Sequence, residues 1–217
     1  MAALPVLYSF RRCPYAMRAR HALLVTGQPV EIREVVLRDK PPELREASAK
    51  ATVPVLVLPD GSVIDESIDV IDWALDQADP AGWRPRDPAQ VAESESLIAQ
   101  NDGPFKHHLD RYKYTERGSA ESLAHRAEAA KILAPLDARL RRQDHLLGGK
   151  RSRVDAALLP FVRQFANADR RWFDDQPWPG LQRWLTAYTA SEAFARVMVK
   201  LPRWTAGDPV QVFPTPG

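Results

Sequence analysis

Strand and helix patterns alternate through the first eighty residues, and this order restricts the folds that the chain can adopt. A β-rich run at 6–10 is followed by a helical run that starts at Pro14 and stops at Gly27. Apolar and charged residues then alternate through 30–36, which predicts a strand with one solvated face. Such a β-α-β unit normally makes its two strands parallel.

A second group of elements follows in the same segment. Residues 53–58 predict a strand that Pro54 restricts to an edge or an entrance, because proline cannot donate to a central ladder. Turn residues at 59–62 predict a hairpin whose return strand begins at 63–64, and a helix opens at Glu66. The first part of the chain is therefore predicted to be an α/β layer.

The composition changes at the Pro-rich, charged segment 80–88, which we interpret as a linker between domains. Beyond it we find no strand pattern. Helical patterns occupy 89–116, 119–142, 152–168 and 181–200. The tail from 201 holds four Pro and is expected to lie extended on the surface. The predicted organisation is an α/β domain at 1–79, the linker, and an all-helical domain at 89–217.

Composition excludes several classes of protein. The 30 basic and 28 acidic side chains nearly balance, so charge gives no argument for nucleic acid as a partner. No apolar run approaches the length needed to cross a bilayer, and the N-terminus does not resemble a signal peptide. The expected protein is cytoplasmic and does not bind a membrane.

The chain has a single cysteine, Cys13, at the end of the first predicted strand. One thiol excludes an internal disulfide, a zinc site built on several thiolates and a two-thiol redox motif. The N-terminus of a helix stabilises an anion, and a thiol placed there has a lowered pKa and becomes nucleophilic. The alternative is a buried structural cysteine that packs as a small apolar group.

Five histidines are scattered along the chain, and neither a His-x-x-x-His pair nor a histidine and carboxylate cluster stands out. The sequence therefore predicts no metal site.

Several motifs in order carry a resemblance to a known family. They are Cys13-Pro14-Tyr15-Ala16-Met17-Arg18-Ala19-Arg20, Leu37-Arg38-Asp39-Lys40-Pro41, Thr52-Val53-Pro54-Val55-Leu56, Asp65-Glu66-Ser67-Ile68, and Ser152-x-x-Asp155 with Pro160. With these motifs the chain resembles the cytosolic glutathione transferases, and the first motif is most similar to their Cys-containing, omega-like branch and its bacterial relatives. The resemblance implies an α/β thioredoxin-like N-terminal domain, an all-α C-terminal domain, a homodimer, and glutathione as co-substrate.

The resemblance also implies which residues bind glutathione. Val53 precedes a cis-proline, and its backbone would pair with the peptide as an added strand does. Glu66 and Ser67 would bind the γ-glutamyl group at a helix N-terminus, although Ser67 or Asp65 could also be an ordinary cap. Lys40 would pair with the glycyl carboxylate, whereas a lone loop lysine is usually only solvated.

Tyr15 and Leu37 would be glutathione contacts rather than catalysts. Other branches of the family activate the glutathione thiol with a Tyr or Ser hydroxyl, which directs attention to Tyr8 and Ser9. We interpret Tyr8 as a core side chain and Ser9 as a turn residue, and we prefer Cys13 because only a thiol can form a mixed disulfide with glutathione.

The second-substrate site is expected in the helical domain. Phe105, His108 and Tyr112 lie three and four residues apart, so they share one helix face, which by the resemblance borders the cleft beside glutathione. Ordinary packing of this face between the two domains is the alternative.

Together these features predict a glutathione-dependent transferase with Cys13 as nucleophile. Thiol transfer to or from small-molecule or protein mixed disulfides is favoured, with weak conjugation of electrophiles. A non-catalytic binding module or ligand carrier is the alternative. A glutaredoxin-like reductase of protein disulfides is disfavoured, because Ala16 stands where a resolving thiol would be.

Overall fold

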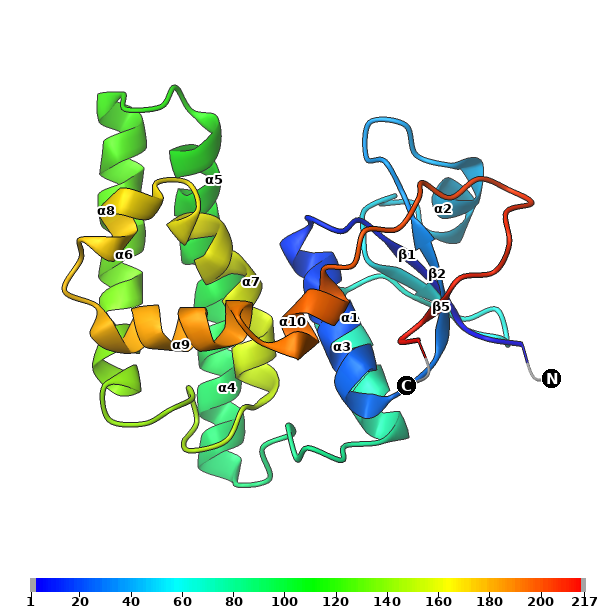
Figure 1. The fold of residues 1–217 in the computed structure, drawn as a ribbon, viewed down its shortest axis with the longest axis horizontal. Coiled ribbons are helices and arrows are strands. Elements are labelled where there is room, and N and C mark those ends of the chain that lie inside the picture. Colours follow the sequence, from blue (N-terminus) through cyan, green and yellow to red (C-terminus); the bar gives the residue numbers. More distant parts are fainter. Residues whose placement is uncertain (1–2, 216–217) are drawn as a thin grey trace. The chain divides into compact units, whose positions relative to one another are not determined.

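The computed structural model describes residues 3–215, which divide into two compact units (Figure 1). Unit 1 takes in the described residues as far as Gly82 together with those from Ser191 on, and unit 2 is Trp83–Ala190. In sequence, unit 2 therefore lies between the two segments that form unit 1.

Unit 1 contains a five-stranded mixed sheet. Its elements are β1 (Val6–Ser9), α1 (Pro14–Thr26), β2 (Val30–Glu34), α2 (Pro42–Ala47), β3 (Val55–Val57), β4 (Val63–Ile64), α3 (Ser67–Gln77), α10 (Glu192–Val197) and β5 (Val212–Phe213). The strand order is β4-β3-β1-β2-β5, in which β1 and β2 are parallel and every other neighbouring pair is antiparallel. The predicted β-α-β unit and the hairpin after it are confirmed.

Strand β5 is a correction to the sequence analysis. The all-helical domain predicted for 89–217 and the surface tail predicted from 201 both fail at this point, because Val212 and Phe213 pair with Glu31 and Val30 of β2. The pairing supplies hydrogen bonds to what would otherwise be an open sheet edge, and it buries the Phe213 ring. Two residues are too few to show a strand period in sequence.

Unit 2 is helical throughout its described elements. They are α4 (Pro88–Gln100), a π-helical turn η1 (Asn101–Phe105), α5 (Lys106–Tyr114), α6 (Ala120–Leu140), α7 (Arg153–Ala166), α8 (Arg170–Asp174) and α9 (Pro179–Thr189). The predicted class, an α/β thioredoxin-like domain with an all-α domain, is confirmed.

Details of the helices differ from the sequence patterns. The pattern at 89–116 contains the π-helical turn around Pro104, and α8 was not predicted. The pattern at 181–200 is interrupted at Ala190, since the Ser191 side chain accepts a hydrogen bond from the Phe194 N–H and starts α10.

Local sequence explains the best-defined helix boundary in unit 2. The predicted capping box is present, with Ser152 at the N-cap of α7 and Asp155 three residues later. The backbones of α9 and of the segment after α6 approach closely at Gly180, where a Cβ would lie 2.7 Å from the Arg141 amide nitrogen.

In the part of the chain that the structure describes, no helix is both long enough and apolar enough to span a membrane.

Candidate functional site

Cys13 lies at the N-cap of α1, immediately before Pro14 at the first helical position. Its thiol is half-buried and lies 3.6 Å from the Val53 carbonyl oxygen, to which it donates. The Val53–Pro54 peptide is cis, as the family resemblance implied. Cys13 and Val53, forty residues apart in sequence, therefore meet at the start of α1.

Arg18, one turn further along α1, connects this region to α3. The guanidinium is fully buried, donates to the Ser67 hydroxyl at 3.2 Å, and lies over the Tyr15 ring at 5.4 Å from its centroid. Tyr15 and Ser67 are predicted glutathione contacts from sequence, whereas no sequence pattern indicates that Arg18 joins them. The periodicity of a helix cannot reveal such a bond, because it depends on how α1 packs on α3.

Two carboxylates and a lysine gather at the N-terminus of α3. Asp65 accepts from the Ser48 hydroxyl at 2.7 Å and from Lys50 at 3.3 Å, and Lys50 also binds the Glu66 carboxylate. The hydrogen bond from Ser48 holds the pKa of Asp65 below its ordinary value. No motif in the sequence marked Lys50, which the fold brings to these two carboxylates.

Leu37 and Lys40 lie in the loop between β2 and α2. Leu37 is 40% exposed and Lys40 is partly buried, and Arg203 from the C-terminal segment pairs with Asp39 of this loop at 2.5 Å. Leu37 and Lys40 remain predictions for glutathione contact.

The two competing hydroxyls have other partners. Tyr8 is buried, accepts from Arg33 at 2.8 Å, and packs edge-on against Trp204, so its interpretation as a core side chain is confirmed. Burial raises the pKa of Tyr8, which disfavours a phenolate. Ser9 is the last residue of β1 rather than a turn residue, and its buried hydroxyl accepts a hydrogen bond from Arg20.

The residues predicted for the second substrate lie in unit 2. Phe105 and Tyr112 are buried and both contact the Phe165 ring, with centroids 5.7 and 5.3 Å away. Their rings therefore contribute to the core of unit 2. His108 is partly exposed, and it lies beside His125 of α6.

No spacing in the sequence indicated a histidine cluster, but the fold brings three histidines together. His107, His108 and His125 gather on α5 and α6, although 17 residues separate His108 from His125. Burial, together with the neighbouring His107 and His125, lowers the pKa of His108.

Comparison with protein-family descriptions gives two matches along the chain. Residues 7–83 match "Glutathione S-transferase, N-terminal domain", and residues 81–187 match "Glutathione S-transferase, C-terminal domain". A rice protein from Oryza sativa subsp. indica, named "Probable glutathione S-transferase GSTU1", is 30% identical over an alignment of 177 residues that covers 76% of this chain and 75% of that protein.

Two solved structures share the fold. A glutathione transferase family member from Pseudomonas fluorescens pf-5, with two glutathione bound, has a TM-score of 0.79 at 18% identity and covers 91% of this chain and 93% of its own. The Tau class glutathione S-transferase MiGSTU from mango, Mangifera indica L., has a TM-score of 0.79 at 22% identity, with coverage of 92% and 94%. Identities this low establish the fold, and they do not single out the Cys-containing branch.

Proposed function

Because the chain belongs to the glutathione S-transferase family, we propose that it is a glutathione-dependent transferase with Cys13 as its nucleophile. The favoured reaction is thiol transfer, including the reductive removal of glutathione from small-molecule or protein mixed disulfides. We expect it to act as a cytoplasmic homodimer.

The observation that carries this proposal is the position of Cys13 at the N-terminus of α1, where its thiol is only half-buried. The first amide groups of a helix have no partner within it, and together with the dipole they favour a thiolate over a thiol. A partly exposed thiolate is suited to disulfide exchange.

The exchange proceeds in two balanced steps. The Cys13 thiolate attacks the glutathione sulfur of a mixed disulfide, forms a Cys13–glutathione disulfide and releases the substrate as a thiolate. The thiolate of a second glutathione then attacks this disulfide, forms oxidised glutathione and regenerates the Cys13 thiolate. No resolving cysteine is required, which agrees with Ala16 in the motif.

The start of α3 is the proposed site for the γ-glutamyl group. Ser67 offers a hydroxyl and a helix N-terminus to the carboxylate of glutathione, and Glu66 offers a carboxylate to its ammonium. Arg18 holds the Ser67 hydroxyl in position, and Lys50 would share Asp65 and Glu66 with the ligand ammonium. Tyr15, Leu37, Lys40 and the Val53 backbone are proposed to complete the contacts.

Replacement of Cys13 by Ala tests the nucleophile. We expect Cys13→Ala to reduce a mixed disulfide of cysteine and glutathione no faster than free glutathione does without enzyme, while calorimetry still detects glutathione binding through α3. Tyr8→Phe is the matched control and should keep the activity, since it removes only a buried hydroxyl bonded to Arg33. Undiminished reduction by Cys13→Ala would refute the proposal, and conjugation of an electrophile that greatly exceeds disulfide reduction would reverse the favoured chemistry.

A binding or carrier function is favoured by a different observation. Unit 1 contains a largely apolar cavity of about 360 Å³. Its lining residues are Ile32, Ala195, Arg196, Val199, Leu201, Val212, Phe213 and Thr215. This alternative predicts that calorimetry detects no glutathione binding and that Cys13 does not react with thiol reagents.

A further inference from the structure

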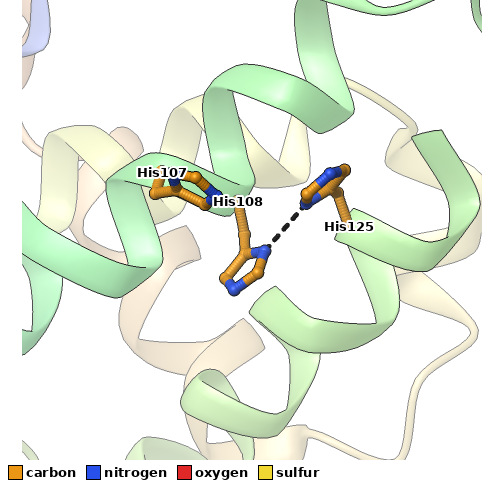
Figure 2. Close-up of side chains that lie close together, drawn as sticks. All are labelled: His107, His108 and His125. Atoms are coloured by element: carbon orange, nitrogen blue, oxygen red, sulfur yellow. Dashed lines mark hydrogen bonds between the residues drawn. The ribbon is translucent and has the colours of Figure 1, made fainter. Parts of the chain in front are cut away.

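Three imidazole rings form a compact cluster on the surface of unit 2 (Figure 2). His107 and His108 are adjacent residues of α5, and His125 comes from α6. The Nδ1 atoms of His108 and His125 lie 2.9 Å apart, and one ligand nitrogen from each of the three rings lies within 4.8 Å of the others. No chemical step of the proposed transfer by Cys13 uses this histidine cluster, which consists of His107, His108 and His125.

From this geometry we propose that the histidine cluster binds a divalent first-row transition metal ion, with Zn²⁺ as the best fit. Imidazole nitrogen is a preferred ligand of zinc, copper and nickel. Three protein nitrogens with water in the fourth position make a tetrahedral zinc site of the open type.

The distances suit such an ion. Zinc–nitrogen bonds of about 2.0–2.1 Å in a tetrahedron place the ligand nitrogens roughly 3.3–3.4 Å apart. The Nδ1 atoms of His108 and His125 lie closer together than this, at 2.9 Å, and all three ligand nitrogens lie within 4.8 Å of one another, so we expect small rotations of the side chains to form the site. His107 is exposed and the other two rings are partly exposed, which leaves a path for the ion.

Charges around the cluster act in opposite directions. Glu128, one turn after His125 on α6, interacts electrostatically with His108 and His125 and favours a cation. Arg111 lies 3.0 Å from the Nδ1 of His107 and disfavours one, because it adds positive charge and occupies a ligand atom. Binding through His107 therefore uses its other nitrogen or displaces Arg111, and removal of the arginine should strengthen the site.

Zinc titration of the untagged full-length chain tests the proposal. The titration is followed by calorimetry at pH 7.5 in a Cys13→Ser background, so that the thiol is not a ligand. We expect one equivalent to bind, and His125→Asn, which removes the only ligand from α6, to weaken binding by at least about tenfold. His107→Asn changes an exposed side chain and should weaken it as well. Arg111→Gln is the matched control, expected to bind zinc more tightly than the background protein does.

A second readout identifies the ligands directly. Cobalt(II) bound to three imidazoles and water gives visible d–d bands typical of low coordination number, without the thiolate charge-transfer band that Cys13 would produce. Affinity that is unchanged by both His125→Asn and His107→Asn would overturn the proposal. So would binding that occurs in the wild type and disappears in Cys13→Ser, or the absence of any stoichiometric binding in the background protein.

Discussion

Among single residues, Asp155 shows most clearly how one side chain holds several segments of unit 2 together. Its carboxylate is fully buried and accepts from the Leu146 N–H at 3.0 Å and the Trp184 Nε1–H at 2.9 Å. It also accepts from the N–H and hydroxyl of Ser152 at 2.9 and 2.7 Å. The Nδ1 of His145 lies 3.7 Å from the same carboxylate. The sequence marked Asp155 only as half of a capping box.

Replacement of Asp155 by Asn should destabilise unit 2 by about 2–4 kcal/mol, since an amide cannot accept on both sides and leaves buried donors unpaired. Urea unfolding followed by tryptophan fluorescence measures the loss. Asp174→Asn is the matched control, because this exposed carboxylate forms a surface pair with Arg170 on the same helix and should matter little. Equal stability of the two variants would contradict the role of Asp155.

The same carboxylate predicts the direction of a pH effect. Burial would raise the pKa of Asp155, but contacts from His145, the Leu146 N–H and Ser152 hold it below its ordinary value. The unfolded chain then binds the proton more readily than the folded one, so this stabilisation is present above the ordinary pKa of about 3.9 and is lost as pH falls below it. The difference in unfolding free energy between the wild type and Asp155→Asn should therefore shrink from pH 5 to pH 3. A difference that grows towards low pH would refute this assignment.

At the scale of elements, Arg20 connects α1 both to the segment from β1 to α1 and to the C-terminal helix α10. Its buried guanidinium donates to the Val197 carbonyl of α10 at 2.9 Å, to the Arg11 carbonyl at 2.6 Å, and to the Ser9 hydroxyl. The loop that carries Cys13 is thus fixed by a residue that also holds the C-terminal helix. A change in α10 can therefore alter the position of the nucleophile.

Strand β5 makes a prediction that has an internal control. The Ile32 N–H of β2 donates to the Gln211 carbonyl at 2.8 Å, whereas the neighbouring Glu31 N–H donates to the Pro5 carbonyl beside β1. In a chain that ends at Val210, the Ile32 amide should lose most of its protection from hydrogen exchange and the Glu31 amide should keep it. Exchange measured by NMR distinguishes the two amides. Loss of protection at both would mean that β5 stabilises the whole sheet rather than its edge.

The sequence predicted those elements whose pattern is local. The first strand, the helix from Pro14 and the second strand follow from periodicity and from the Gly27 stop, and the Ser152–Asp155 box follows from its spacing. The position of Cys13 could be inferred in the same way. A local pattern is enough to predict an element when residues within that element, or next to it in sequence, set where it begins and ends.

The remaining features depend on contacts between distant segments. The Arg18–Ser67 bond needs the packing of α1 on α3, and the Lys50–Glu66 pair needs the loop before β3 to reach the start of α3. The histidine cluster needs α5 and α6 side by side. No spacing rule within a single element encodes such distances, which is why neither the position of Lys50 nor the histidine cluster can be inferred from the sequence.

For the molecule as a whole, the main fact is that unit 1 is discontinuous in sequence. Trp83–Ala190 form unit 2 between its two parts. The C-terminal part places Trp204 against the sheet. The guanidinium of Arg33 lies 4.3 Å from the centroid of the Trp204 ring, and the backbone N–H of Trp204 donates to the Glu34 carbonyl at 2.8 Å. A conventional division into an N-terminal and a C-terminal half therefore cuts through the core of unit 1.

A fragment that ends at Gly82 should consequently be incomplete. It retains α1 and the first four strands, but Tyr8 and Arg33 lose their contact with Trp204, and Arg20 loses its acceptor on α10. Since burial of a large aromatic side chain contributes about 3–5 kcal/mol, we expect this fragment to be largely unfolded or to unfold at much lower urea than unit 1 of the full chain.

Addition of a synthetic peptide of residues 191–215 should restore the sheet, as judged by exchange protection at Ile32 and by circular dichroism. The same peptide with Trp204→Ala is the control, and it should bind more weakly because it lacks the ring that contacts Tyr8 and Arg33. If the fragment alone were as stable as unit 1 of the full chain, the C-terminal segment would be peripheral and would not contribute to the hydrophobic core. Recovery with the native peptide and not with the control would show that the thioredoxin-like unit is completed by residues from the far end of the chain.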